Sequence, residues 1–281
     1  MTEARTLAPP ERRVAEVLEC RRIGAYSLIA AADAGGPADP RPGQFYMLAA
    51  GERWGGGRAE RPYLPRAFSF ARARPRAGGG TDLDFLLEDV GPGTGRLGEL
   101  GPGEPLSLVG PLGVGFCPPA PGTEPLLVGG GIGTAPLLCL DDELRAAGGP
   151  PAPVILGFRS AVHAEAAGLF AGETTVTTDD GSAGRAGLVT EPLLERLEQG
   201  PPATVYACGP PPMLEAVRAL CAARGVSAQL ALESGMACGF GACFGCVVAT
   251  REGYIRVCVD GPVVDAELLK TALVAGGGHQ G

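Results

Sequence analysis

Lysine and histidine are almost missing from this sequence of 281 residues, which has a single lysine, Lys270, and two histidines, His163 and His279. Neither histidine has a visible catalytic partner, so we do not expect general acid–base catalysis to be the task of this chain. Nearly all positive charge comes from arginine, and the formal net charge is −8. This acidic balance argues against nucleic acid or an anionic membrane surface as the main partner.

Long apolar runs are also absent. The longest, residues 126–140, is interrupted by four glycines and a proline and is too short to span a bilayer. Residues 1–19 carry charges and prolines but no apolar core, so we expect no secretory signal. These absences predict a cytoplasmic protein, in which nine cysteines indicate metal or redox chemistry before disulfide bonds.

Glycine and proline, in contrast, are abundant, with 46 and 27 copies. Such a content can indicate disorder, and the lack of a G-X-Y period excludes collagen. Hydrophobic residues make up 45% of the chain and charged residues only 19%, so it can bury enough apolar surface to fold. We therefore expect most glycines in turns and in loops that approach ligands.

Three regions with different patterns predict a multidomain β plus α/β protein. Residues 1–120 hold short apolar or alternating runs separated by turn residues, which favour an antiparallel β-barrel with strands at 13–18, 26–31, 45–49, 67–71, 83–88 and 105–109. Residues 121–228 alternate strands and helices, which favours a parallel sheet with helices at 136–147, 191–198 and 211–224. Residues 229–281 form a small cysteine-rich module. The polar segment 51–61, which contains Trp54, is expected to be a mobile loop.

The strongest motif is the cysteine cluster of the third region. Cys238, Cys243 and Cys246 follow the C-x4-C-x2-C spacing of plant-type [2Fe–2S] proteins, and Cys258 comes after a gap of eleven residues. The interspersed glycines (Gly239, Gly241 and Gly245) would allow the tight or positive-φ turns that aim backbone N–H groups at the cluster sulfurs. The alternative is a zinc site with four thiolates, although zinc sites usually show two well-separated C-x2-C pairs. Since the gap to Cys258 is shorter than in plant ferredoxins, we expect a smaller, specialised fold.

A second motif, Arg66-Ala67-Phe68-Ser69, resembles the Arg-x-aromatic-Ser/Thr motif of ferredoxin reductase-like flavoproteins. The resemblance implies that the arginine pairs with the FAD pyrophosphate, while the aromatic ring and the hydroxyl approach the flavin. Downstream, Gly93 and Thr94 open a predicted helical turn at 95–100 whose free N–H groups would suit a phosphate. The strand residues between, Leu86, Leu87 and Glu88, stand where this family contacts the flavin. The segment 110–113 is either a further approach to the cofactor or a plain turn.

A third motif follows an apolar strand and precedes a helix, at residues 129–136. It is not a GxGxxG fingerprint, but it resembles the nicotinamide-binding turn of the same flavoproteins, which implies contacts from Gly130, Gly131, Gly133 and Thr134. The later segment Cys208-Gly209-Pro210 resembles the Cys-Gly-Pro segment beside the nicotinamide, where Cys208 is a pocket residue and not a cluster ligand. NAD is the expected dinucleotide by resemblance only. Arg159, at the end of the second strand, could instead welcome a 2′-phosphate.

The order of barrel, nicotinamide domain and cysteine module, together with segment 233–246, resembles the electron-transfer subunits of class 1B dihydroorotate dehydrogenases. The resemblance implies FAD and a [2Fe–2S] cluster in this chain and an FMN-containing catalytic subunit as partner, in a heterotetramer of two plus two. Electrons from dihydroorotate would pass from that FMN through the cluster to FAD and leave as hydride on NAD⁺, in pyrimidine biosynthesis. The family usually has Pro and Ile where this chain has Ala67 and Phe68, which leaves details of the flavin contact open.

Two alternatives remain at this point. One is a diaphorase-type FAD/[2Fe–2S] subunit of another NAD(P)H-linked complex, of the sulfhydrogenase or NADH-dependent ferredoxin:NADP oxidoreductase type. The other is a zinc-stabilised scaffold without enzymatic activity. We also predict that Phe240 and Phe244 border a partner surface, with burial in the module's core as the competing interpretation.

Overall fold

The computed structural model describes residues 11–50 and 64–274; segment 51–61 with Trp54, and His279, lie outside these residues. The first part is a closed antiparallel barrel, as predicted, and its strands follow the order β1-β2-β5-β4-β3-β6. Its strands are β1 (Arg13–Ile23), β2 (Tyr26–Asp33), β3 (Phe45–Ala50), β4 (Arg66–Pro75), β5 (Thr81–Glu88) and β6 (Pro105–Leu112). Edge-to-face contacts of Tyr46 with Phe70 and Phe85 fill its centre. The helical turn expected at 95–100 begins earlier, as α1 (Pro92–Gly98).

The second part is a sheet with the order β10-β9-β8-β7-β11-β12-β15, parallel from β10 to β12. Its strands are β7 (Glu124–Gly130), β8 (Val154–Phe158), β9 (Thr174–Thr178), β10 (Arg185–Ala186), β11 (Ala203–Cys208) and β12 (Ala228–Ala231). The connections contain η1 (Gly131–Gly133), α2 (Thr134–Ala146), α3 (Ala161–Ala164), η2 (Glu165–Leu169), α4 (Thr190–Gln199) and α5 (Pro211–Arg224). Helix α5 has prolines in its first turn and ends at Gly225 in the left-handed conformation, so the sequence itself marks both ends.

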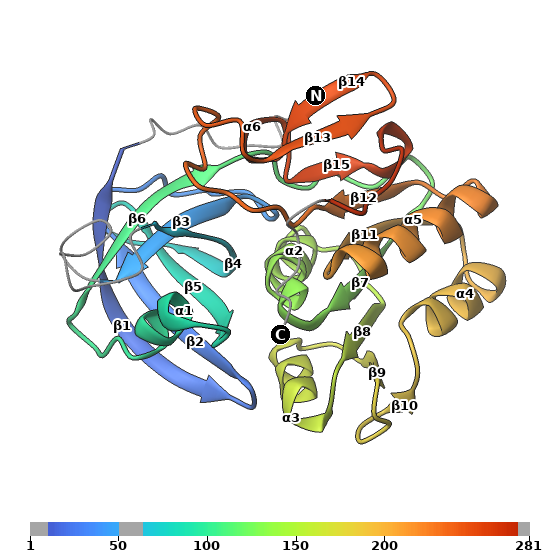
Figure 1. Cartoon of the computed structure of the whole chain (residues 1–281). Helices are drawn as coiled ribbons and strands as arrows, with labels where there is room; N and C mark the ends of the chain where they lie inside the picture. Colours follow the sequence, from blue (N-terminus) through green and yellow to red (C-terminus); the bar gives the residue numbers. More distant parts are fainter. Residues whose placement is uncertain (1–10, 51–63, 275–281) are drawn as a thin grey trace.

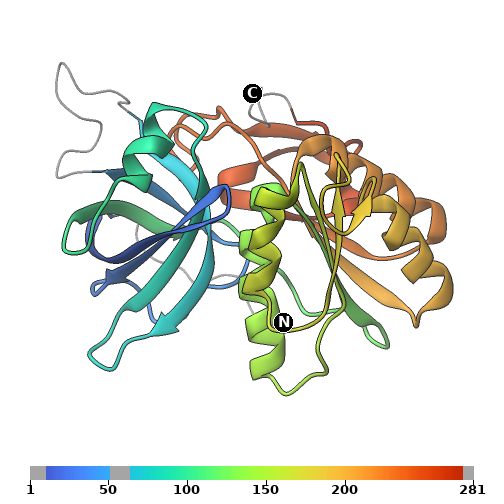
Figure 2. The ribbon, with the colours of Figure 1, turned by 90° about the horizontal axis from the view of Figure 1, so that it is seen from below.

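Helix α2 lies between the barrel and the sheet, whereas α4 and α5 cover the opposite face of the sheet (Figures 1 and 2). Two ion pairs tie α2 to the barrel: Arg41 lies 2.8 Å from Glu143, and Arg72 lies 2.9 Å from Asp142. The apolar run at 126–140 is thus divided between β7, η1 and α2. Among the described residues no helix is long and apolar enough to cross a membrane.

The C-terminal part bridges the other two. It contains β13 (Val247–Thr250), β14 (Gly253–Arg256), α6 (Val257–Asp260), β15 (Val263–Asp265) and η3 (Ala266–Leu268). Strand β15 pairs antiparallel with β12 and so completes the sheet of the second part. The expected boundary between residues 228 and 229 therefore falls inside β12. In Figure 1 this C-terminal part lies at the top, across both the barrel and the sheet.

Candidate functional site

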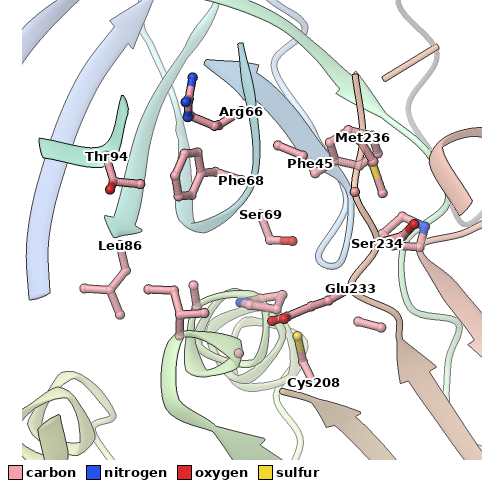
Figure 3. Close-up of a pocket in the computed structure, with 18 of the residues that line it drawn as sticks. Phe45, Arg66, Phe68, Ser69, Leu86, Thr94, Cys208, Glu233, Ser234 and Met236 are labelled. Carbon is pink, nitrogen blue, oxygen red and sulfur yellow. The ribbon is translucent and has the colours of Figure 1, made fainter. Parts of the chain in front are cut away.

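A cavity of about 540 Å³ lies where the barrel, the parallel sheet and the C-terminal part meet. Strands β3, β4 and β5 and the turn before α1 form one wall, while η1, the start of α2, the end of β11 and the segment after β12 form the other. Figure 3 shows Ser69 on the barrel side, facing Glu233 and Cys208 across the cavity. Nine of the predicted cofactor-binding residues line it: Arg66, Ala67, Phe68, Ser69, Leu86, Gly93, Thr94, Gly133 and Cys208.

Arg66 and Gly93 fit each other closely. A Cβ atom at Gly93 would overlap the guanidinium of Arg66, so glycine lets this side chain lie against the α1 turn. The guanidinium donates a hydrogen bond of 2.5 Å to the carbonyl oxygen of Leu64, and among the described residues no carboxylate forms an ion pair with it. Burial lowers the pKa of Arg66, an effect that an anionic ligand beside it would offset. The pair is suited to a phosphate.

The hydroxyl of Thr94 shapes the same turn. Its Oγ1 accepts hydrogen bonds from the backbone N–H groups of Val90 at 2.9 Å and Gly91 at 3.1 Å. It also lies 2.9 Å from the carbonyl oxygen of Gly91, to which it can donate. Thr94 therefore holds the loop at the cavity wall in a defined conformation, which is the preorganisation that a phosphate site requires.

The two predicted nicotinamide motifs are in direct contact. A Cβ at Gly133 would overlap the carbonyl oxygen of Cys208 and lie 2.6 Å from the backbone nitrogen of Gly209. Gly131 has φ +53°, in the region that favours glycine, and the buried Thr134 donates a hydrogen bond of 2.7 Å to its carbonyl oxygen. Of these motifs Gly133 and Cys208 line the cavity, whereas the predicted contacts Gly130, Gly131, Thr134, Gly209 and Pro210 are not part of its lining, and Pro210 is exposed.

The three residues of strand β5 that were predicted to contact the flavin lie in three different environments. Leu86 faces the cavity, while Leu87 is buried in the barrel core, because successive side chains of a strand point to opposite faces. Glu88 lies outside the cavity lining, where it forms an ion pair with Arg159 and lies 3.4 Å from the Nε2 atom of His163. Arg159 is therefore already paired in this structure.

His163 lies less exposed than a surface helix would suggest. Its ring packs edge-on against Tyr26 of the barrel at 5.8 Å, and only 17% of its side chain is exposed. The barrel residue that covers it, Tyr26, is more than 100 residues away in the chain, so local sequence does not indicate this contact. Its contacts join the barrel to the second part of the chain.

The segment that follows β12 supplies five lining residues, 232–236, for which the sequence analysis predicted no contact. Burial raises the pKa of Glu233 to about 7 and, with Glu233 beside it, keeps the pKa of the buried Cys208 thiol well above its ordinary value. The apolar stretch 230–232, followed by polar residues, is a strand-end signal that could have identified this wall. The lining residues for which no contact was predicted are Phe45, Val90, Gly91, Pro92, Ile132, Ala135, Pro136, Ala231, Leu232, Glu233, Ser234, Gly235, Met236 and Pro262, of which Ile132, Ala135 and Pro136 lie within the predicted turn 129–136.

The cysteine loop has the backbone that the glycines predict, with one difference. Gly239 and Gly241 have φ +82° and +86°, but the third positive φ, 57°, belongs to Phe244 and not to Gly245. The loop packs closely against β3, since a Cβ at Gly239 would lie only 2.7 Å from the sulfur of Met47. Phe240 and Phe244 are 48% and 64% exposed, so they are not part of the core.

The four predicted ligands lie in this loop and at α6. The Sγ atoms of Cys246 and Cys258 are 3.2 Å apart, and both residues are buried. At Cys238 burial opposes ionisation, yet hydrogen bonds from the backbone N–H groups of Cys243 and Phe240 lower its pKa to about 6. Backbone donors aimed at a thiolate are what an iron–sulfur centre requires. In residues 11–50 and 64–274 no three cysteine, histidine or carboxylate side chains already converge on one point, so the full ligand set stays a prediction.

Comparisons with known proteins agree with this arrangement. Residues 233–270 match the family model described as the iron-sulfur cluster binding domain of dihydroorotate dehydrogenase B. The chain is 38% identical to the dihydroorotate dehydrogenase B (NAD(+)) electron transfer subunit of Caldanaerobacter subterraneus subsp. tengcongensis, covering 81% of this chain and 86% of that protein. It is 41% identical to the subunit of the same name from Geobacillus thermodenitrificans, covering 80% and 85%.

Solved structures share the fold at lower identity. A structure of an NADH-dependent reduced ferredoxin-NADP oxidoreductase superimposes with a TM-score of 0.76 at 24% identity, over 92% of this chain and 91% of that chain. A ferredoxin NADP⁺ reductase from Neisseria gonorrhoeae with bound FAD and NADP gives a TM-score of 0.59 at 17% identity, over 76% and 92%. At these identities the likenesses concern the fold alone.

Proposed function

Because this chain belongs to the family of dihydroorotate dehydrogenase B electron transfer subunits, we propose that its cavity holds FAD and its cysteine loop a [2Fe–2S] cluster. The chain is an oxidoreductase subunit, and the family decides against both a zinc-stabilised scaffold and a diaphorase subunit of another complex. The observation that carries the proposal is that the cavity wall continues directly along the chain into the cysteine loop. Met236 lines the cavity and Cys238 begins the cysteine loop two residues later, a span of at most about 7 Å.

The proposed cofactor contacts fall into three groups, for the FAD pyrophosphate, the flavin and the cluster. Arg66, Gly93 and Thr94 hold the FAD pyrophosphate, and Phe68, Ser69 and Leu86 lie along the flavin. Ala67 contributes to the same wall, and strand residues Leu87 and Glu88 support it from the barrel core and from the ion pair with Arg159. The cluster is held by Cys238, Cys243, Cys246 and Cys258.

Gly133 and Cys208, on the opposite wall of the cavity, would hold the nicotinamide of NAD⁺ and present it for hydride transfer. Gly130, Gly131, Thr134, Gly209 and Pro210 belong to the two turns that bring Gly133 and Cys208 to that wall. NAD, and not NADP, is proposed as the dinucleotide because Arg159, the arginine at the end of β8, is engaged by Glu88.

The proposed overall reaction balances in electrons and protons. Oxidation of dihydroorotate on the partner releases two electrons and two protons. NAD⁺ takes both electrons with one proton as hydride, and the second proton goes to solvent. A flavin can accept the electrons singly and deliver them in pairs, which is the chemistry it supplies when bound. The residues of this chain hold the two cofactors near one another and keep the flavin out of bulk water.

The partner in this proposal is the FMN-containing catalytic subunit, in a heterotetramer of two plus two in the cytoplasm. The exposed rings of Phe240 and Phe244 border the surface on which it docks, since aromatic side chains are enriched at interface centres. The roles of the three parts follow the predicted division: an FAD-binding barrel (1–120), an NAD-binding domain (121–228) and a cluster module (229–281). Strand β12 crosses the second boundary, so the NAD-binding domain and the cluster module share one sheet.

The test is to purify the chain alone and together with its catalytic subunit. We expect visible bands of flavin and iron–sulfur that bleach on reduction, with one FAD, two irons and two sulfides per chain, counts that follow from the two proposed cofactors. With the partner present, dihydroorotate should produce NADH. A colourless chain containing zinc, or a cluster-bearing chain whose native partner lacks flavin, would contradict the proposal.

A further inference from the structure

Arg256 is a cation placed against the cysteine loop, defined here as residues 238–246. It is the last residue of β14 and pairs with Val247, the residue that directly follows Cys246. Cys258 comes two residues later along the chain. The backbone thus places Arg256 opposite the residue after one proposed cluster ligand, Cys246, and two residues before another, Cys258.

Its side chain contacts the cysteine loop at two separate points. One guanidinium nitrogen donates a hydrogen bond of 3.3 Å to the carbonyl oxygen of Gly241, and the guanidinium carbon lies 5.3 Å from the ring centre of Phe244. Gly241 and Phe244 both have positive φ, which is readily adopted by glycine but costly for phenylalanine, so one of the two contacts falls on the strained residue of the loop. A Cβ at Gly241 would lie 3.1 Å from the same guanidinium nitrogen, which leaves little room for any other arrangement.

One carboxylate partly balances this charge. Asp260 accepts a hydrogen bond of 2.8 Å from the backbone N–H of Arg256, and its carboxylate lies 3.9 Å from the Nε atom. Both side chains are partly exposed, so the ion pair is weak and screened by solvent. The guanidinium group keeps its charge at any accessible pH.

We propose that Arg256 is a positioning residue for electron transfer: it clamps the cysteine loop and its positive charge raises the reduction potential of the cluster held there. The inference rests on the proposed function, because it requires the cluster. A cluster on four thiolates becomes more negative by one electron on reduction, and a nearby cation stabilises that form more than the oxidised one. No proton moves, and the arginine itself is unchanged by the transfer.

Three variants separate the effect of the Arg256 charge from the effect of its contacts with the cysteine loop. Arg256→Gln removes the charge but keeps a hydrogen-bond donor for the loop, whereas Arg256→Lys keeps the charge without the planar guanidinium. Asp260→Asn removes the balancing carboxylate and so acts in the opposite direction. The matched control is Arg251→Gln, in the turn at the far end of the β13–β14 hairpin, three residue pairs or about 10 Å from Arg256.

The measurement is a redox titration of the purified, cluster-loaded chains followed by electron paramagnetic resonance, with iron and sulfide determined in parallel. At the wild-type midpoint potential we expect Arg256→Gln to lower the reduced-to-oxidised ratio about tenfold, a shift of ~59 mV for a one-electron couple. Arg256→Lys should shift less, Asp260→Asn should shift upward, and Arg251→Gln should match the wild type.

An unchanged potential in Arg256→Gln, or an equal shift in Arg251→Gln, would overturn the inference. If Arg256→Gln does not retain iron, the decision passes to Asp260→Asn, and the absence of an upward shift there overturns it. A wild-type chain without iron and sulfide would instead refute the proposed function, and the inference with it.

Discussion

Gly133 lies against Cys208 so closely that a Cβ atom would overlap the carbonyl oxygen of Cys208. This contact joins the Gly-rich turn after β7 to the end of β11. Because the overlap is with backbone, it cannot be relieved by a change of rotamer. The side of the cavity proposed for nicotinamide therefore depends on one missing methyl group.

Gly133→Ala is expected to destabilise the chain by about 1–3 kcal/mol, the usual range for overpacking, and to weaken NADH binding more than FAD binding. The melting temperature and the Kd for NADH check this. Gly168→Ala is the control, since nothing lies within 4 Å of its Cβ position. Equal effects at the two positions would contradict the assignment of this wall.

Arg66→Met is expected to lower FAD affinity at least about tenfold, because hydrogen bonds to a charged group contribute roughly 1.5–3 kcal/mol. Arg66→Lys should retain part of it, with charge but without bidentate geometry. The measurement is the flavin-to-protein ratio after gel filtration. Arg76→Met, on the barrel hairpin where Arg76 pairs with Asp82, controls for loss of an arginine. Full flavin content in Arg66→Met would remove this residue from the site.

Glu233 makes stability depend on pH. Burial raises its pKa from 4.5 to about 7, so the folded state binds a proton that the unfolded state has released between these values. Stability should therefore fall as pH rises from about 4.5 to about 7 and then level off. Glu233→Gln should remove this contribution, which denaturant unfolding at several pH values will measure. Parallel pH profiles of the wild type and Glu233→Gln would contradict the burial of this carboxyl in the cavity.

Cys243→Ser is expected to abolish iron binding while FAD remains bound, because the flavin side of the cavity does not include this residue. Iron, sulfide and flavin contents provide the readout. Cys117→Ser, which removes an exposed cysteine outside the loop, should change none of them. Retention of iron in Cys243→Ser would show that the proposed ligand set is wrong.

Phe240 and Phe244 are expected to contribute to the affinity for the catalytic subunit. Phe244→Asn suits the positive φ at that position, so a loss of binding cannot be assigned to backbone strain. We expect the Kd for the partner to rise roughly thirtyfold, the effect of losing about 2 kcal/mol at an interface centre. Val14→Asn, an exposed barrel position, is the comparison. Unchanged affinity in Phe244→Asn would place the interface elsewhere.

Most elements could be predicted from local pattern. The barrel strands follow from alternating runs, and α5 begins and ends where its prolines and Gly225 predict. The Arg66–Ser69 motif, the Gly-rich turn and the cysteine spacing are equally local, because each needs only neighbouring residues to express its chemistry. Glu88 and Arg159 show the limit of this reasoning. Each was assigned a ligand role by position, yet they pair with each other across the junction between barrel and sheet.

The sequence by itself thus determined the three parts, their order and the identity of the motifs, since backbone propensity and ligand spacing act over a few residues. Only the tertiary structure decided which motifs share one cavity, that Glu233 stands half-buried beside Cys208, and that Arg256 lies on the cysteine loop. β15 pairs with β12, so the segment between these strands, which includes the cavity wall after β12 and the cysteine loop, is held at the sheet edge. The cysteine loop also packs against Met47 of the barrel. The physical reason is that burial, pKa shifts and charge contacts depend on residues far apart in the chain, whose meeting is set by sheet order and packing.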